Sequence, residues 1–124
     1  MWDRDVVEAF IATDPEKPRR YAELEVAPTN ERLDVMVVDL PKKDFEWTSH
    51  FQSAVKVDTK AKVWKCEMRI PLSALSETLP AAGTRWRLNL FRCDRANQAG
   101  LAWSPTLSGT FHVPEKFGVL EFVE

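Results

Sequence analysis

The chain has 124 residues, 44% of them hydrophobic, and its five Trp and seven Phe supply large side chains to bury. This length and composition predict a single packed domain over residues 1–124 and exclude a disordered chain. The formal net charge is −2, with acidic and basic residues interspersed. A nucleic-acid-binding protein needs a concentrated basic surface, so that class is excluded. No apolar run has the length to span a bilayer, which argues against membrane insertion.

Seven segments have the β-rich or alternating pattern of strands, and turn residues separate them. In chain order they span residues 5–11, 21–27, 33–40, 51–58, 63–70, 85–93 and 117–123. The second segment alternates clearly, because Ala22, Leu24 and Val26 face one side and Glu23 and Glu25 the other. This pattern predicts an all-β fold, an antiparallel β-sandwich.

One short helical turn is expected at residues 70–75, since Pro71 suits a first helical position. Residues 95–114 contain two glycines and two prolines and are expected to form a long irregular loop. A loop of this length in a compact domain usually carries function.

The two cysteines are expected to be free thiols. If segments 63–70 and 85–93 are antiparallel neighbours, Cys66 points inward beside Leu90, whereas Cys93 has the opposite parity. The pattern therefore predicts no disulfide, and two cysteines are too few for a disulfide framework or a metal site.

Five strings occur in an order and spacing that resemble one known family. They are Trp2 with residues 6–11, Glu67-Met68-Arg69-Ile70-Pro71, residues 86–92 (Trp-Arg-Leu-Asn-Leu-Phe-Arg), Ala102-Trp103-Ser104-Pro105, and residues 111–118 (Phe-His-Val-Pro-Glu-Lys-Phe-Gly). Together they resemble the family 9 carbohydrate-binding modules, and especially the stand-alone bacterial proteins similar to them. The resemblance covers essentially the whole chain. It implies a β-sandwich related to the DOMON-like group, a sugar held in a slot between two aromatic rings, and structural calcium as an option.

The resemblance also assigns residues to the slot. The first aromatic ring matches Trp2 and the second matches Phe111, while the family acid matches Glu8 and the polar strand residues match Arg87 and Asn89. The full set of implied ligand-binding residues is Trp2, Glu8, Glu25, Arg87, Asn89, Phe91 and Phe111. The implied partner is an oligosaccharide or polysaccharide.

The chain departs from the family pattern at three points. Phe111 stands where the best-characterised sugar binders have Trp, and Glu25 stands where they have a basic residue. The family module also has strands before the string that begins at Val6, and none precede Trp2 here. The chain thus resembles a domain that lacks its N-terminal portion, which predicts an exposed sheet edge or an open core. We expect a periplasmic or secreted location, with any exporting segment outside this chain, and a place in a larger glycan-processing protein or system.

The physical case for a sugar site rests on complementary surfaces. A pyranose has apolar C–H faces and a rim of hydroxyls, so its site needs flat apolar rings and a few placed donors and acceptors. Trp2 and Phe111 would supply the rings, and Glu8 would accept from hydroxyls to which Arg87 and Asn89 donate. Plainer interpretations stay open: a chain end at Trp2, a core-closing ring at Phe111, an ordinary solvated strand face for the polar residues.

A catalytic interpretation is weaker. Glu23 and Glu25 lie two positions apart on one strand face, about 6.6 Å between Cα atoms, within the range of paired glycosidase carboxylates. Such enzymes need the pair to flank a bond in a cleft, in two different environments. Neighbouring positions on one strand give similar environments, so we expect a solvated face, a calcium ligand or a sugar contact here, and no enzyme.

Two further functions compete with carbohydrate binding. A haem-binding electron-transfer domain of the DOMON-like kind would need axial ligands from Met36, Met68, His50 or His112. A structural or interaction sandwich with a vestigial sugar site would explain the departures at Phe111 and Glu25.

Overall fold

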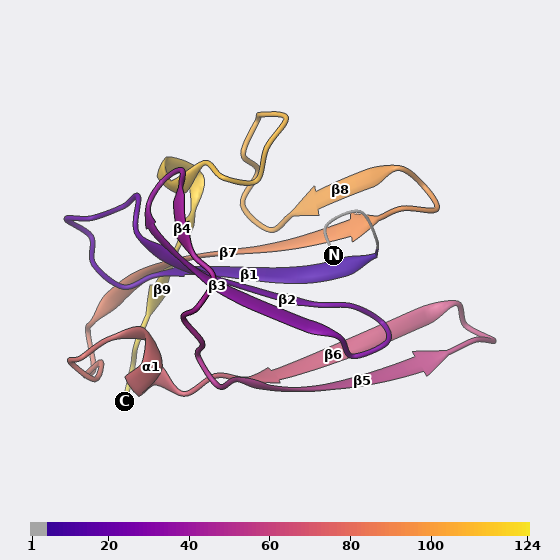
Figure 1. The fold of residues 1–124 in the computed structure, drawn as a ribbon, viewed down its shortest axis with the longest axis horizontal. Coiled ribbons are helices and arrows are strands. Elements are labelled where there is room, and N and C mark those ends of the chain that lie inside the picture. Colours follow the sequence, from indigo (N-terminus) through magenta and orange to yellow (C-terminus); the bar gives the residue numbers. More distant parts are fainter. Residues whose placement is uncertain (1–4) are drawn as a thin grey trace.

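The structure is a computed structural model that describes residues 5–124, and it consists of two antiparallel β-sheets stacked on one another (Figure 1). Its elements are β1 (Val6–Ala12), β2 (Tyr21–Val26), β3 (Arg32–Asp39), β4 (Lys42–Asp44), β5 (Gln52–Asp58), β6 (Val63–Arg69), α1 (Leu72–Leu75), β7 (Arg85–Asp94), β8 (Ala99–Ala102), η1 (Pro114–Lys116) and β9 (Gly118–Glu121). The predicted all-β sandwich with one short helical turn is confirmed.

The larger sheet has the strand order β4-β3-β2-β1-β7-β8, and β9 pairs with the other end of β7. Strands β5 and β6 form the second sheet, a hairpin that lies below the larger sheet in Figure 1. All seven predicted strands are present. The structure adds the short strand β8 within the predicted loop 95–114, and the short strand β4 in a segment for which no strand was predicted.

The predicted pairing of segment 63–70 with segment 85–93 is wrong. Strand β6 pairs with β5 through a short local turn, and β7 lies between β1 on one side and β8 and β9 on the other. Alternation along a strand fixes which side chains share a face, but it does not specify the partner strand. Leu90, predicted to point inward, is 45% exposed. Cys66 and Cys93 are free, as predicted.

Both faces of the larger sheet are covered. The face toward the hairpin carries an apolar core that includes Ala9, Leu24 and Trp86. The opposite face, here called the outer face, carries a second cluster with Phe10, Tyr21, Val37, Phe91 and Phe117. Strand β2 is consequently buried at every position, although its sequence alternates. The acidic residues of β2 therefore lie beneath other side chains instead of in solvent.

Candidate functional site

A pocket of about 690 Å³ opens on the outer face of the larger sheet. Strands β1, β2, β3, β4, β7 and β8 form its floor and sides, and residues 108–112 form one wall. The lining residues are Glu8, Phe10, Glu23, Glu25, Leu33, Val35, Lys43, Phe45, Cys93, Gly100, Ser108, Gly109, Thr110, Phe111 and His112. Three of the residues predicted to bind ligand, Glu8, Glu25 and Phe111, are thus brought together.

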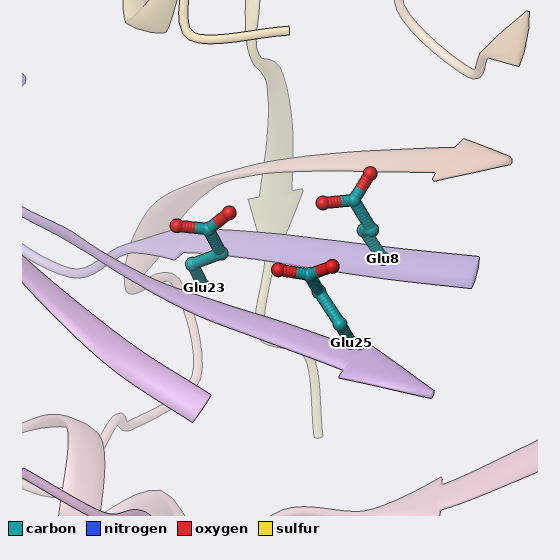
Figure 2. A group of neighbouring side chains, drawn as sticks. All are labelled: Glu8, Glu23 and Glu25. Atoms are coloured by element: carbon teal, nitrogen blue, oxygen red, sulfur yellow. The ribbon is translucent and has the colours of Figure 1, made fainter. Parts of the chain in front are cut away.

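The floor of the pocket holds three carboxyl groups, here called the acidic cluster: Glu8, Glu23 and Glu25. Glu8 on β1 is the register partner of Glu25 on β2, and Glu23 lies two residues earlier on β2, so all three side chains project from the same face (Figure 2). One oxygen from each lies within 4.8 Å of the others. The residues are only 6%, 5% and 2% exposed, respectively.

Burial changes the acidity of two members of the cluster. It raises the pKa of Glu8 to about 8, with repulsion from Glu25 and then from Glu23 adding to the effect of desolvation. It raises the pKa of Glu25 to about 7, with repulsion from Glu23 as the next cause. Both causes disfavour the charged form, because a buried charge loses hydration and like charges repel.

Two basic side chains border Glu23. The Lys43 Nζ lies 3.3 Å from its Oε2, close enough for an ion pair although the angles do not make a hydrogen bond. The His112 Nε2 lies 3.8 Å from its Oε1, and a 2.6 Å hydrogen bond joins the His112 Nδ1 to the Tyr21 hydroxyl. Burial lowers the pKa of His112, which favours the neutral ring. With the Tyr21 hydroxyl donating to Nδ1, the Nε2–H of that neutral ring faces the carboxylate.

An aromatic wall stands beside the acidic cluster. The Phe111 ring stacks on Phe91 with ring centroids 4.2 Å apart, and Phe91 meets Phe10 edge to face at 4.6 Å. Phe111 is half-buried and lines the pocket, whereas Phe91 is buried behind it. Gly100 leaves room for the ring, because a Cβ there would lie 3.3 Å from the Phe111 Cζ. The outer ring is therefore held in a fixed orientation.

Two other predicted ligand residues have backbone partners. Asn89 is fully buried: its Nδ2 donates to the Ser104 carbonyl at 2.8 Å, and its Oδ1 accepts from the Ser104 and Leu90 amides. The Arg87 guanidinium donates to the carbonyls of Phe117 and Gly118. These side chains, with Phe91, tie the 103–118 segment to the sheet and do not line the pocket. Trp2, the predicted first slot wall, lies outside the described residues.

Sequence patterns contain only weak signals for several pocket residues. The spacing of Glu23 and Glu25 predicted that both lie on one strand face, but it indicated that this face is exposed to solvent. Lys43 lies on a strand that no pattern predicted, and Phe45 follows directly after it. His112 falls in the segment expected to be an irregular loop, and its stacking on Phe10, with centroids 4.9 Å apart, depends on the fold.

Comparison with known proteins decides the family. Residues 1–124 match the family described as Carbohydrate family 9 binding domain-like. The chain belongs to this family. The resemblance inferred from the five sequence strings is confirmed, whereas the more distant likeness to DOMON-like sandwiches stays a prediction.

Relatives of this family 9-like chain are longer than it is. An "Extracellular protein" of Arthroderma benhamiae is 28% identical over 142 residues, covering 99% of this chain and 63% of the relative. The crystal structure of an inferred carbohydrate-binding protein of Bacteroides uniformis superposes with a TM-score of 0.75 at 22% identity, covering 98% of this chain and 62% of that one. At that identity the second similarity supports the fold alone. Within residues 5–124, no helix is long and apolar enough to cross a membrane.

The family 9-like fold places the candidate haem ligands in different environments. Met36 and Met68 belong to the same core between the two sheets, whereas His112 lies on the outer face of the larger sheet. His50 is exposed in the segment before β5. Haem binding through these residues stays a prediction.

Proposed function

We propose that this protein binds an oligosaccharide or polysaccharide, without catalysis, in the outer-face pocket. The observation that carries the proposal is the Phe111 ring, fixed by its stack on Phe91, beside the carboxyl groups of Glu8 and Glu25 in one pocket. A ring held in place offers an apolar face to a pyranose at little entropic cost. The carboxyl groups accept hydrogen bonds from its hydroxyls. Membership of the carbohydrate family 9 binding domain-like family supports sugar binding in general.

We assign fewer residues to direct ligand contact than the sequence predicted. Glu8, Glu25 and Phe111 face the ligand, and Trp2 is retained as the proposed opposite ring. Phe91 acts by supporting Phe111. Arg87 and Asn89 hold the segment that carries Phe111, so they position the site without touching the sugar.

The spacing of the carboxyl groups supports a binding role over hydrolysis. Glycosidase carboxyl pairs stand about 5 Å or more apart, on either side of the scissile bond. One oxygen from each of the three residues lies within 4.8 Å of the others, and all three side chains project from the same face of the sheet (Figure 2). A sugar could contact this group from one direction, but its glycosidic bond could not lie between two of its members.

We propose a secreted or periplasmic location. The naming of the Arthroderma benhamiae relative as an extracellular protein supports this. Because the chain spans 63% of that relative, we also propose that the domain works within a larger glycan-processing protein or system.

The test is a calorimetric titration of the full chain with glucan, xylan and host-type oligosaccharides. We expect binding that Phe111→Ala weakens at least tenfold. Trp103→Ala is the matched control, because Trp103 is 58% exposed and lies outside the pocket. A folded protein that binds none of these sugars, or that loses binding through Trp103 and not Phe111, would contradict the proposal.

A further inference from the structure

The acidic cluster places three carboxyl groups beside a single lysine among the described residues that line the pocket. Of the described residues that line the pocket, Lys43 is the only lysine or arginine, and three carboxyl groups face it. Its ammonium group lies against Glu23, at 3.3 Å. Glu8 and Glu25 have no basic partner of this kind among the described residues that line the pocket.

Glu25 is the clearest sign of an unmet partner. It is 2% exposed, and its Oε1 is buried without a hydrogen-bond partner among the described residues. Among the described residues, the hydrogen-bond partner of its neighbour Glu8 is a weak donor, the Cys93 thiol, with 3.9 Å between Sγ and Oε2. A buried carboxyl oxygen without a partner is costly, and such groups in proteins are normally paired with a donor or a cation.

The shape of the cluster fits an ammonium group. Charge-assisted N–H···O bonds are about 2.7–2.9 Å long, so a tetrahedral ammonium separates its acceptors by about 4.4–4.7 Å. The three carboxyl oxygens lie within 4.8 Å of one another, an upper limit that is compatible with this geometry. Lys43 already places one ammonium group at the edge of the cluster, against Glu23.

The rest of the pocket fits a ring attached to that ammonium. Phe111 and Phe45 add aromatic surface next to the cluster, and the volume of about 690 Å³ exceeds the needs of a single ion. From these observations we propose that the pocket selects an amino sugar with a free ammonium group, such as a glucosamine unit of a deacetylated glycan. The ammonium would bind Glu8 and Glu25 while the ring lies against Phe111. This inference rests on the proposed carbohydrate binding and narrows its substrate class.

A neutral sugar and a metal ion each match the pocket less well. Sugar hydroxyls can hydrogen-bond to the carboxyl groups but bring no charge to offset theirs. Calcium would accept the oxygen ligands and their spacing, yet it would bring two charges close to the Lys43 ammonium. Among the described residues that line the pocket, Lys43 pairs with Glu23 and no other lysine or arginine reaches Glu8 or Glu25, so an ammonium group would give these two carboxyl groups a cationic partner.

The test compares glucosamine and a fully deacetylated chitosan dimer with glucose and N-acetylglucosamine, by calorimetry on the full chain at pH 7.5. We expect the amino sugars to bind at least tenfold more tightly than the neutral ones. Glu25→Gln should remove that preference while keeping the side-chain shape. Glu67→Gln, an exposed position on β6, should keep it and controls for the change in net charge.

Lowering the pH gives a second readout on the same samples. At pH 5.5 protons compete for Glu8 and Glu25, so the affinity for the amino sugars should fall while that for glucose stays nearly constant. The titratable groups of the pocket that face these carboxyls are Glu23, Lys43, Cys93 and His112, and the charge of the chain's amino terminus also acts on Glu25, lowering its pKa.

Three other outcomes would contradict the amino-sugar inference, and one of them would also contradict carbohydrate binding. Equal affinity for glucose and glucosamine would overturn the amino-sugar inference and leave carbohydrate binding intact. No binding of any sugar to the folded protein would overturn both. Calcium binding that is tighter than any amine and is lost in Glu25→Gln would also overturn the inference, since the cluster would then be a metal site.

Discussion

Glu8 and Glu25 face each other across the β1–β2 pair as direct register partners, and both carboxyl groups lie on the covered outer face. Two acids at opposed positions in an antiparallel pair repel each other when both are ionised. The arrangement therefore lowers the stability of the native state at neutral and basic pH, where more of these carboxyl groups ionise.

The first prediction concerns pH and stability. Both carboxyls ionise near 4.5 when unfolded, but the native protein holds their protons up to pKa values of about 8 for Glu8 and about 7 for Glu25. The native state therefore binds more protons than the unfolded state between these limits, and stability falls as the pH rises from 5 to 8. Glu25→Gln should raise the unfolding free energy at pH 8 by about 1–3 kcal/mol and flatten its pH dependence.

Urea denaturation at pH 5, 6.5 and 8 measures this effect. Glu67→Gln, on the exposed side of the hairpin, should reproduce the wild-type curve. A Glu25→Gln variant that is less stable than wild type at pH 8 would show that the carboxylate is paired favourably. The groups that act on Glu8 and Glu25 in this comparison include Glu23, Lys43, Cys93 and His112 of the pocket, and the chain's amino terminus, whose charge lowers the pKa of Glu25.

The second prediction concerns the size of the aromatic wall. Phe111→Trp should strengthen sugar binding severalfold, because a larger ring covers more of a pyranose face, and Phe111→Leu should weaken it while keeping the pocket apolar. Titration calorimetry of the three forms should give sugar affinities that decrease in the order Trp, Phe, Leu at position 111. Equal sugar affinities for the three forms would mean that the ring at position 111 packs in the core and does not contact the sugar.

The third prediction separates positioning from contact at Asn89. Its amide makes two hydrogen bonds to the backbone of Ser104, a half-buried residue, so Asn89→Ala leaves these backbone groups without that partner and should cost about 1–3 kcal/mol of stability. Denaturant unfolding measures the loss, with the exposed Gln52→Ala as a near-neutral control. Full stability combined with lost sugar affinity would instead place Asn89 in contact with the ligand.

The fourth prediction concerns Gly118, the first residue of β9. A Cβ at this position would overlap the indole ring of Trp103, which lies against the glycine. Gly118→Ala should lower stability by about 1–3 kcal/mol through overpacking and displace the ring into solvent. Trp103→Ala should relieve the overlap, so that the double variant is more stable than the sum of the single changes predicts. Strict additivity in unfolding experiments would show that the two residues do not interact.

The strands were accessible from the sequence because alternation and turn residues are local. Ala22, Leu24 and Val26 share the core face as their spacing indicates, and the five family strings identified the relationship. The same local pattern gave the wrong partner for β6, since it contains no information on which strand lies next to which. The short strand that carries Lys43 has too little pattern to be recognised.

The chemical character of the site was decided by the tertiary structure alone. Alternation predicted that Glu23 and Glu25 face away from the core, and they do, but a polar face is solvated only if nothing covers it. Here a segment that includes Phe111 and His112, more than eighty residues further along the chain, folds over that face. Residue order thus determined the side on which each carboxyl lies, whereas burial, and with it their raised pKa values, arose only when distant segments packed together.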